Sequence, residues 1–191
     1  MSDAADDGNG PEAAASVDTG AEGRGPWARF ALTFGLLAIA SEALYYGWIL
    51  ESAPFQHYLV VLAKTGTFIL GWFDADVAVH GSRIHSGAFA VEIAQGCDAI
   101  EVCFLLAAAI LAFPVEFRFK WRGLVFGIAM LQILNMVRIV TLFWIGALFP
   151  KVFRTSHEVV WPGILIVLTI VIWIGWVRWE DEASRRRENE A

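Results

Sequence analysis

Three side chains capable of covalent and proton-transfer chemistry stand at the start of, or inside, apolar stretches of this sequence. Cys97 begins one apolar run, Arg138 interrupts a second and His157 begins a third. A thiolate can attack a carbonyl carbon, arginine can stabilise the oxyanion that forms, and histidine can deliver a proton to the leaving amine. These residue types predict nucleophilic acyl transfer if the fold brings them together.

The sequence around Cys97 contains features that act on the thiol in opposite directions. Asp98 and Glu101 have the spacing of a capping box, and a thiol at a helix N-terminus is stabilised as the thiolate. The carboxylate of Asp98 would instead raise the pKa of the thiol. The alternative is that Cys97 is a small buried apolar residue, as most free cysteines are. Cys103 is expected to face away from Cys97 and is interpreted as packing.

Arg138 is the residue that packing alone explains least well. A guanidinium inside an apolar helix is costly and marks either a function or a buried ion pair. Gln132, Asn135 and Arg138 recur at steps of three and predict a polar ridge along one side of the helix. The alternative role of Arg138 is an ion pair with Glu42 or Glu101 that only fixes helix packing.

His157 occurs in a second pattern typical of a helix start, with Thr155 as the cap and Glu158 three residues later. A histidine at this place could move protons near neutral pH, and the alternative is an ordinary interfacial histidine. The remaining histidines lack metal-ligand spacing, and no metal or cofactor is expected. They are His57, His80 and His85.

The composition predicts a membrane protein. Of the 191 residues, 57% are hydrophobic and 18% are charged, which is more apolar than a soluble domain. Six acidic residues and one arginine in residues 1–26 account for most of the net charge of −6. Residues 1–26 are therefore interpreted as a disordered acidic tail, residues 27–179 as the membrane domain and residues 180–191 as a charged cytoplasmic tail. Without a basic surface, nucleic acid is not an expected partner.

The chain offers several segments of membrane-spanning length. Residues 55–72 are apolar but broken by polar side chains, so they predict an interfacial amphipathic segment, with a fifth crossing as the alternative. Residues 73–96 alternate as in a short hairpin or extended loop. The fold class is therefore all-α integral membrane: a four-span helix bundle with an interfacial segment and a small external hairpin-like insertion. The four expected spans are residues 27–50, 98–113, 123–149 and 157–179.

Basic residues in the short loops predict the orientation in the bilayer. Three groups of basic residues fall on the cytoplasmic side if the chain crosses four times with both termini in the cytoplasm. Lys151 and Arg154 are the exception, because they would lie in an outer loop. This orientation gathers the candidate catalytic residues, and the supporting residues Glu42, Glu101 and Asn135, toward the outer face of the cytoplasmic (inner) membrane. The three groups are Arg24 with Arg29, Arg118 with Lys120 and Arg122, and Arg178 with residues 185–187.

Three sequence features together resemble the exosortase/archaeosortase family, most closely its exosortase H type. They are the segments QGCDAIE (95–101) and LNMVRI (134–139), and His157. The resemblance covers residues 27–179 and implies a membrane cysteine protease that acts as a transpeptidase. Its substrates would be exported proteins with a C-terminal sorting signal, consisting of a short motif, a transmembrane helix and a basic cluster.

The resemblance also assigns roles to residues of this chain. Cys97 matches the nucleophile of the family, Arg138 its arginine and His157 the third catalytic position. The family usually has Ser or Asn and then Gly after the cysteine, whereas this chain has Asp98 and Ala99.

Two other classes of protein remain open from the residues alone. A four-span thiol–disulfide oxidoreductase would need Cys97 and Cys103 to form a redox pair. A non-enzymatic bundle, such as a haem-binding protein using His57 and His157 or a scaffold held by Arg138, would need no reactive thiol.

Overall fold

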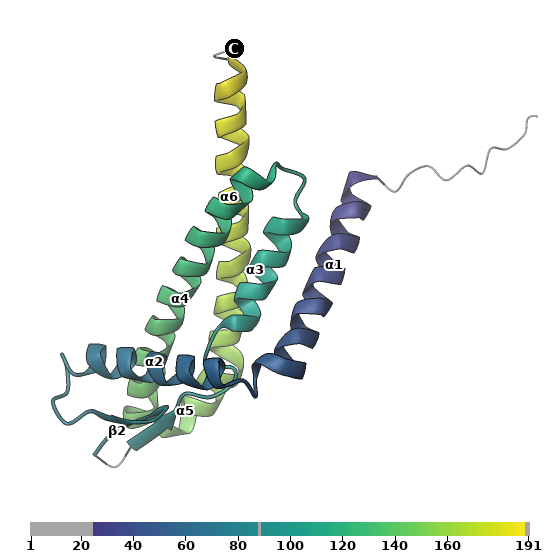
Figure 1. Cartoon of the computed structure of the whole chain (residues 1–191). Helices are drawn as coiled ribbons and strands as arrows, with labels where there is room; N and C mark the ends of the chain where they lie inside the picture. The colour runs from purple at the N-terminus through teal and green to yellow at the C-terminus, as the bar shows by residue number, and fades with distance from the viewer. Residues whose placement is uncertain (1–24, 88, 190–191) are drawn as a thin grey trace, which may run out of the picture.

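The computed structural model describes residues 25–87 and 89–189, so the predicted acidic tail lies almost entirely outside the described residues. Long helices run side by side, and a helix that lies across them closes one end of the bundle together with a small sheet (Figure 1). The helices are α1 (Pro26–Leu44) with the π-helical turn η1 (Tyr45–Ile49), α2 (Ala53–Leu70), α3 (Ile100–Ala112), α4 (Phe117–Leu148), α5 (Pro150–Thr155), the π-helical turn η2 (Ser156–Val160) and α6 (Trp161–Asn189).

Among the described residues, three helical segments are long and apolar enough to cross a membrane. They are Pro26–Ile49, Phe117–Leu148 and Pro150–Arg186, and they confirm a helical membrane protein. Helix α3 has only 13 residues and spans about 20 Å, less than the hydrocarbon thickness of about 30 Å. The expected span at residues 98–113, the second of the four, thus corresponds to a short helix enclosed by α1, α4 and α6.

Helix α2 lies across the end of the bundle rather than along it (Figure 1). Ser52 caps its first turn, because the Ser52 hydroxyl accepts a hydrogen bond from the Phe55 amide at 3.3 Å. Only one face of the helix is buried, which is the pattern predicted for an interfacial amphipathic segment. The buried residues are Phe55, Leu59, Leu62, Ala63, Gly66 and Leu70.

Residues 78–92 form a three-stranded antiparallel sheet in the order β1 (Ala78–His80), β2 (Arg83–Ser86) and β3 (Phe89–Glu92). The side chain of Ile84 in β2 is fully buried and packs beside Gly66 of α2. Phe89 in β3 contacts Phe143 of α4 edge-to-face, with ring centroids 5.5 Å apart. The sheet is therefore attached to α2 and α4, and its last strand leads directly to the Cys97 loop.

Helices α3, α4 and α6 share an apolar core in which a glycine allows close contact. A Cβ atom on Gly123 of α4 would lie 2.6 Å from Nε1 of Trp176, a buried side chain of α6. Side chains from all three helices fill the rest of this core, among them Leu106, Ile110 and Leu131.

We expect Gly123→Ala to lower the free energy of unfolding by about 1–3 kcal/mol, because the buried indole ring must shift or the helices must separate. The matched control is Gly175→Ala on α6, where an added Cβ would meet nothing within 4 Å. That change should be neutral or stabilising by up to about 1 kcal/mol, because alanine favours helix. Equilibrium unfolding in mixed micelles would measure both. Equal effects of the two substitutions would contradict the close contact between α4 and α6.

Candidate active site

A tight loop between β3 and α3 carries Cys97. The Cys97 amide donates a hydrogen bond to the Ala94 carbonyl at 2.9 Å, and Gly96 and Ala99 both have positive φ, at 82° and 58°. Ala99 is thus left-handed, a conformation that favours glycine. The loop holds the Cys97 side chain 6% exposed, immediately before the first turn of α3.

Asp98 holds this loop together rather than forming the expected capping box. Its carboxylate accepts hydrogen bonds from the Tyr45 hydroxyl at 2.9 Å, the Gly96 amide at 3.1 Å and the Ile100 amide at 2.7 Å. The prediction of a capping box was wrong, because Ala99 occupies the N-cap and Glu101 instead accepts a hydrogen bond from Tyr46. Since Asp98 is 1% exposed, three donors compensate the burial of its carboxylate.

The polar ridge predicted on α4 contacts the backbone of the same loop. The Asn135 amide group, fully buried, donates to the Cys97 carbonyl at 3.0 Å. Gln132 donates more weakly to the Asp98 carbonyl at 3.4 Å, and the Tyr58 hydroxyl lies 2.9 Å from that oxygen. Asn135, a supporting residue from the sequence, is therefore a contact of the loop.

His157 lies directly beside the thiol. Its Nε2 is 3.0 Å from the Cys97 Sγ, although the two residues are 60 positions apart in the sequence. Phe153, one turn earlier, stacks on the imidazole with ring centroids 5.9 Å apart and an interplanar angle of 19°. Proximity to the thiol and stacking on Phe153 together position Nε2 to exchange a proton with the sulfur.

The helix around His157 begins earlier than the sequence predicted. It starts at Pro150, which presets the helical backbone, and continues without a break through η2 into α6. Thr155 is helical rather than a cap, and Glu158 pairs with Arg154 at 3.1 Å instead of closing a capping box. The second predicted capping box was therefore also wrong, and His157 lies in a π-helical turn inside the helix.

Arg138 is 3% exposed and belongs to the same pocket as His157. Among the described residues its Nε atom has no hydrogen-bond partner, and no ion pair joins its guanidinium to Glu42 or Glu101. The structure therefore does not contain the ion pair with Glu42 or Glu101 by which Arg138 would only hold the helices together. A buried guanidinium with an unused donor can bind an incoming oxygen atom.

Charges and burial act on Cys97 in opposite directions. Burial raises the pKa of the Cys97 thiol, the nearby guanidinium of Arg138 lowers it, and the carboxylate of Asp98 raises it. Because burial is the largest influence, the net pKa lies above its ordinary value. Burial therefore favours the neutral thiol beside the imidazole of His157.

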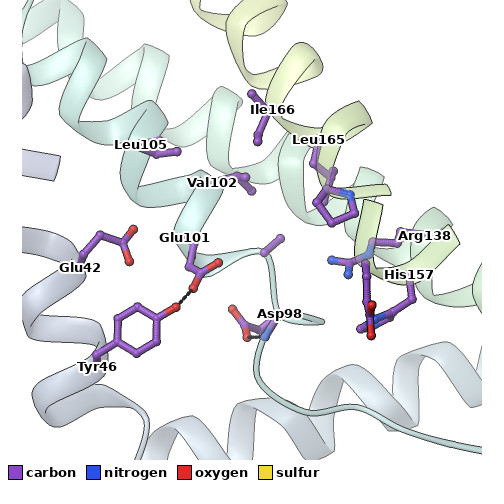
Figure 2. Close-up of a pocket in the computed structure, with 14 residues that line it drawn as sticks. Glu42, Tyr46, Asp98, Glu101, Val102, Leu105, Arg138, His157, Leu165 and Ile166 are labelled. Carbon is purple, nitrogen blue, oxygen red and sulfur yellow. Dashed lines mark hydrogen bonds between the residues drawn. The ribbon is translucent and has the colours of Figure 1, made fainter. Parts of the chain in front are cut away.

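Asp98, Arg138 and His157 border a pocket of about 520 Å³ (Figure 2). Cys97 adjoins this pocket, because its sulfur contacts His157 and its chain neighbours Gly96 and Asp98 line it. Arg138 and His157 line one side of it, and Glu42, Tyr46 and Glu101 line the opposite side. A second, apolar cavity of about 350 Å³ lies between α1, α3 and α6. The two cavities share Leu105 and Ile166, so they adjoin.

The other polar residues considered from the sequence lie elsewhere. Cys103 is a free cysteine, as is Cys97, and its sulfur accepts a weak contact from Gln132 at 3.6 Å. His80 and His85 pair across the β1–β2 turn, with ring nitrogens 3.1 Å apart. Within residues 25–87 and 89–189, no group of three or more His, Cys, Asp or Glu side chains could hold a metal ion.

Three aromatic side chains around the site were missed from the sequence. Tyr45 holds the Asp98 carboxylate, Tyr58 contacts the Asp98 carbonyl and Phe153 stacks on His157. No local pattern distinguishes these rings from the many interfacial aromatics of the chain. The spacing of Phe153 four residues before His157 was the only signal available.

The fold and the site together define a helical membrane protein in which an imidazole and a guanidinium line one pocket and a thiol lies beside the imidazole. The family model described as Transmembrane exosortase (Exosortase_EpsH) matches residues 21–175. The protein belongs to this family, which confirms the resemblance found in the sequence motifs. Its likeness to the exosortase H type stays a prediction. No curated protein and no solved structure matches the chain.

We expect Ala99→Gly to raise the free energy of unfolding, because a left-handed alanine costs about 1–2 kcal/mol. Part of this gain is lost, because glycine gives the unfolded chain more conformational entropy. The net effect should be at most about 1 kcal/mol. Ala99→Val, which places a β-branched side chain at the same φ, should lower stability. Unfolding in mixed micelles measures both changes, and a stabilising valine would contradict the left-handed conformation.

We expect the alkylation of Cys97 by iodoacetamide to have a midpoint above pH of about 8.5, the ordinary pKa of cysteine. The thiolate is the reactive form, so a raised pKa moves the increase in rate to higher pH. Arg138→Gln should move the midpoint higher still, because a charge that lowers the pKa is removed. A Cys103→Ala background leaves a single reporter thiol. A midpoint at or below that of free cysteine would contradict this electrostatic description.

Proposed function

We propose that this protein is a membrane cysteine protease, acting as a transpeptidase, that cleaves C-terminal sorting signals of exported proteins. The observation that carries the proposal is the distance of 3.0 Å between the Cys97 Sγ and His157 Nε2, beside the buried Arg138. Family membership supports the same class of reaction.

In the first step, His157 takes the proton of the Cys97 thiol while the sulfur attacks the carbonyl carbon of the scissile peptide bond. A carbon–sulfur bond forms and the carbonyl oxygen becomes an oxyanion, which Arg138 stabilises. The imidazolium then gives its proton to the leaving amine, the carbon–nitrogen bond breaks, and a thioester on Cys97 remains. Because burial favours the neutral thiol, the adjacent base is essential to this step.

Contacts of the loop support this role for Cys97. Asn135 binds the carbonyl of Cys97 itself, and the Asp98 carboxylate binds amides on both sides of it. Because the backbone is held before and after the nucleophile, the sulfur keeps its direction during attack. Asn135 and Asp98 are therefore positioning residues.

The surroundings of the pocket support a substrate that is anchored in the membrane. The apolar cavity next to the site is lined by side chains such as Phe34, Ile170 and Trp173. A hydrophobic segment that follows the cleavage motif of an exported protein matches this chemistry. In our proposal the chain crosses the cytoplasmic membrane four times with both termini inside, α3 being the short crossing, and the site faces outward.

The oxidoreductase alternative fits the site less well. Both cysteines are free, Cys103 contacts Gln132, and the sulfur of Cys97 contacts a histidine instead of a second thiol. Trapping a disulfide between Cys97 and Cys103 would favour that alternative.

The decisive experiment is Cys97→Ala in the native cell, followed by the molecular weights of exported proteins that carry a C-terminal anchor. We expect these proteins to keep their full length, because the variant lacks the thiol beside His157 and the other cysteine of the chain, Cys103, contacts Gln132. His157→Ala should slow processing by about 10²–10⁴-fold, the usual contribution of a general base.

Cys103→Ala is the matched control, because it removes the other thiol of the chain without touching the pocket. Processing should continue in this variant. Normal processing in folded, membrane-inserted Cys97→Ala protein would refute the protease mechanism and leave a scaffold role.

A further inference from the structure

Two carboxylates occupy the wall of the pocket that faces Arg138 and His157. Glu42 comes from α1 and Glu101 from the first turn of α3 (Figure 2). Tyr46, one turn after Glu42, donates its hydroxyl proton to Glu101. Glu42 and Glu101 thus present an acidic surface to the pocket that His157, the contact of the Cys97 thiol, also lines.

No cation of the described chain neutralises these carboxylates directly. Within residues 25–87 and 89–189, neither Glu42 nor Glu101 forms an ion pair, and the two repel each other. The other acidic groups of the pocket are occupied, because Asp98 binds three donors and Glu158 pairs with Arg154. Two unpaired carboxylates beside an apolar span are costly unless a positively charged ligand joins them.

The opposite wall indicates what kind of ligand this is. Arg138 is 3% exposed and lines the same pocket, and among the described residues its buried Nε has no hydrogen-bond partner. In the proposed function its guanidinium stabilises the acyl oxygen of the thioester on Cys97. A group that binds the facing carboxylates therefore approaches the acyl carbon from the side opposite the arginine.

We propose that Glu42 and Glu101 form the subsite for the primary ammonium group of the acceptor that resolves the acyl-enzyme. This inference rests on the proposed function and assigns its acceptor to the class of primary amines. Glu101, held by Tyr46, binds the ammonium group, and Glu42 takes one proton from it. A single metal cation is a poorer match, since no group of three metal-ligating side chains lies among the described residues.

The transfer step balances in protons and bonds. Loss of one proton to Glu42 leaves a neutral amine whose lone pair attacks the thioester carbon. A carbon–nitrogen bond forms, the carbon–sulfur bond breaks, and the electron pair of that bond remains on Cys97. His157 takes the second proton from the nitrogen and returns it to the sulfur, so the enzyme regains its thiol and an amide is released. Glu42 then gives its proton to water, which restores the carboxylate.

The test uses the full chain in lipid nanodiscs, with Cys97 acylated by p-nitrophenyl acetate. The burst of nitrophenolate above the level of Cys97→Ala reports the acyl-enzyme. Methylammonium chloride is the charged probe, and the ratio of N-methylacetamide to acetate measures how the acyl group is divided between amine and water. This ratio is independent of how fast the acyl-enzyme forms.

We expect Glu42→Gln and Glu101→Gln to lower the amide-to-acetate ratio by about tenfold or more, because each removes a charged hydrogen-bond acceptor. With trifluoroethylamine, which is uncharged at neutral pH, the same variants should leave the ratio unchanged. Glu51→Gln, an exposed glutamate outside the pocket, is the matched control and should behave as the unmodified protein with both probes.

Each outcome separates this inference from the proposed function. A normal burst with an unchanged methylammonium ratio in both variants would overturn the inference alone. An equal fall with the charged and the uncharged probe would also overturn it, because the carboxylates would then only shape the pocket. Absence of any burst that depends on Cys97 would overturn the proposed function, and this inference with it.

Discussion

The burial of one carboxylate, that of Asp98, determines the geometry of the candidate site. A carboxylate that is 1% exposed must be compensated by hydrogen bonds, and its donors come from the Tyr45 hydroxyl and from the amides of Gly96 and Ile100. These hydrogen bonds to the Asp98 carboxylate go with a tight bend of the chain around Cys97, in which Ala99 adopts the left-handed backbone conformation. The backbone carbonyl of Cys97 then faces α4, where Asn135 binds it. The hydrogen bonds that compensate the burial of the Asp98 carboxylate therefore also fix the backbone that carries the Cys97 thiol.

The remainder of the fold brings a base and a cation to this loop. Helix α4 supplies Arg138 together with Asn135, so one polar ridge both binds the loop and points a guanidinium into the pocket. The helix that begins at Pro150 supplies His157, with Phe153 stacked on the imidazole. Helix α2 and the sheet close the end of the bundle beside the loop. The reactive side chains thus come from three separate segments, namely the Cys97 loop, α4 and the helix that begins at Pro150.

Much of the site could be predicted because charged and polar residues are conspicuous in apolar sequence. Arg138, Gln132 and Asn135 stand out in α4 for this reason, and the motif around Cys97 resembles the family that the family model confirms. Both predicted capping boxes were wrong. The Glu101 side chain accepts a hydrogen bond from Tyr46, and the Glu158 side chain pairs with Arg154 inside a helix that begins earlier than predicted. Tyr45, Tyr58 and Phe153 could not be singled out, because aromatic residues are frequent throughout a membrane protein.

The sequence by itself determined that the chain is a helical membrane protein and which side chains are chemically capable, because hydropathy and residue type are local properties. Only the tertiary structure decided that the Cys97 sulfur and the His157 imidazole are 3.0 Å apart and that Arg138 has no ion pair within the described part of the chain. Residues 60 positions apart meet through the packing of helices and the bend of a loop, and no local pattern encodes that distance. Helix packing likewise brings Glu42 of α1 and Glu101 of α3 to one pocket, and the sequence of neither helix predicts that they meet there.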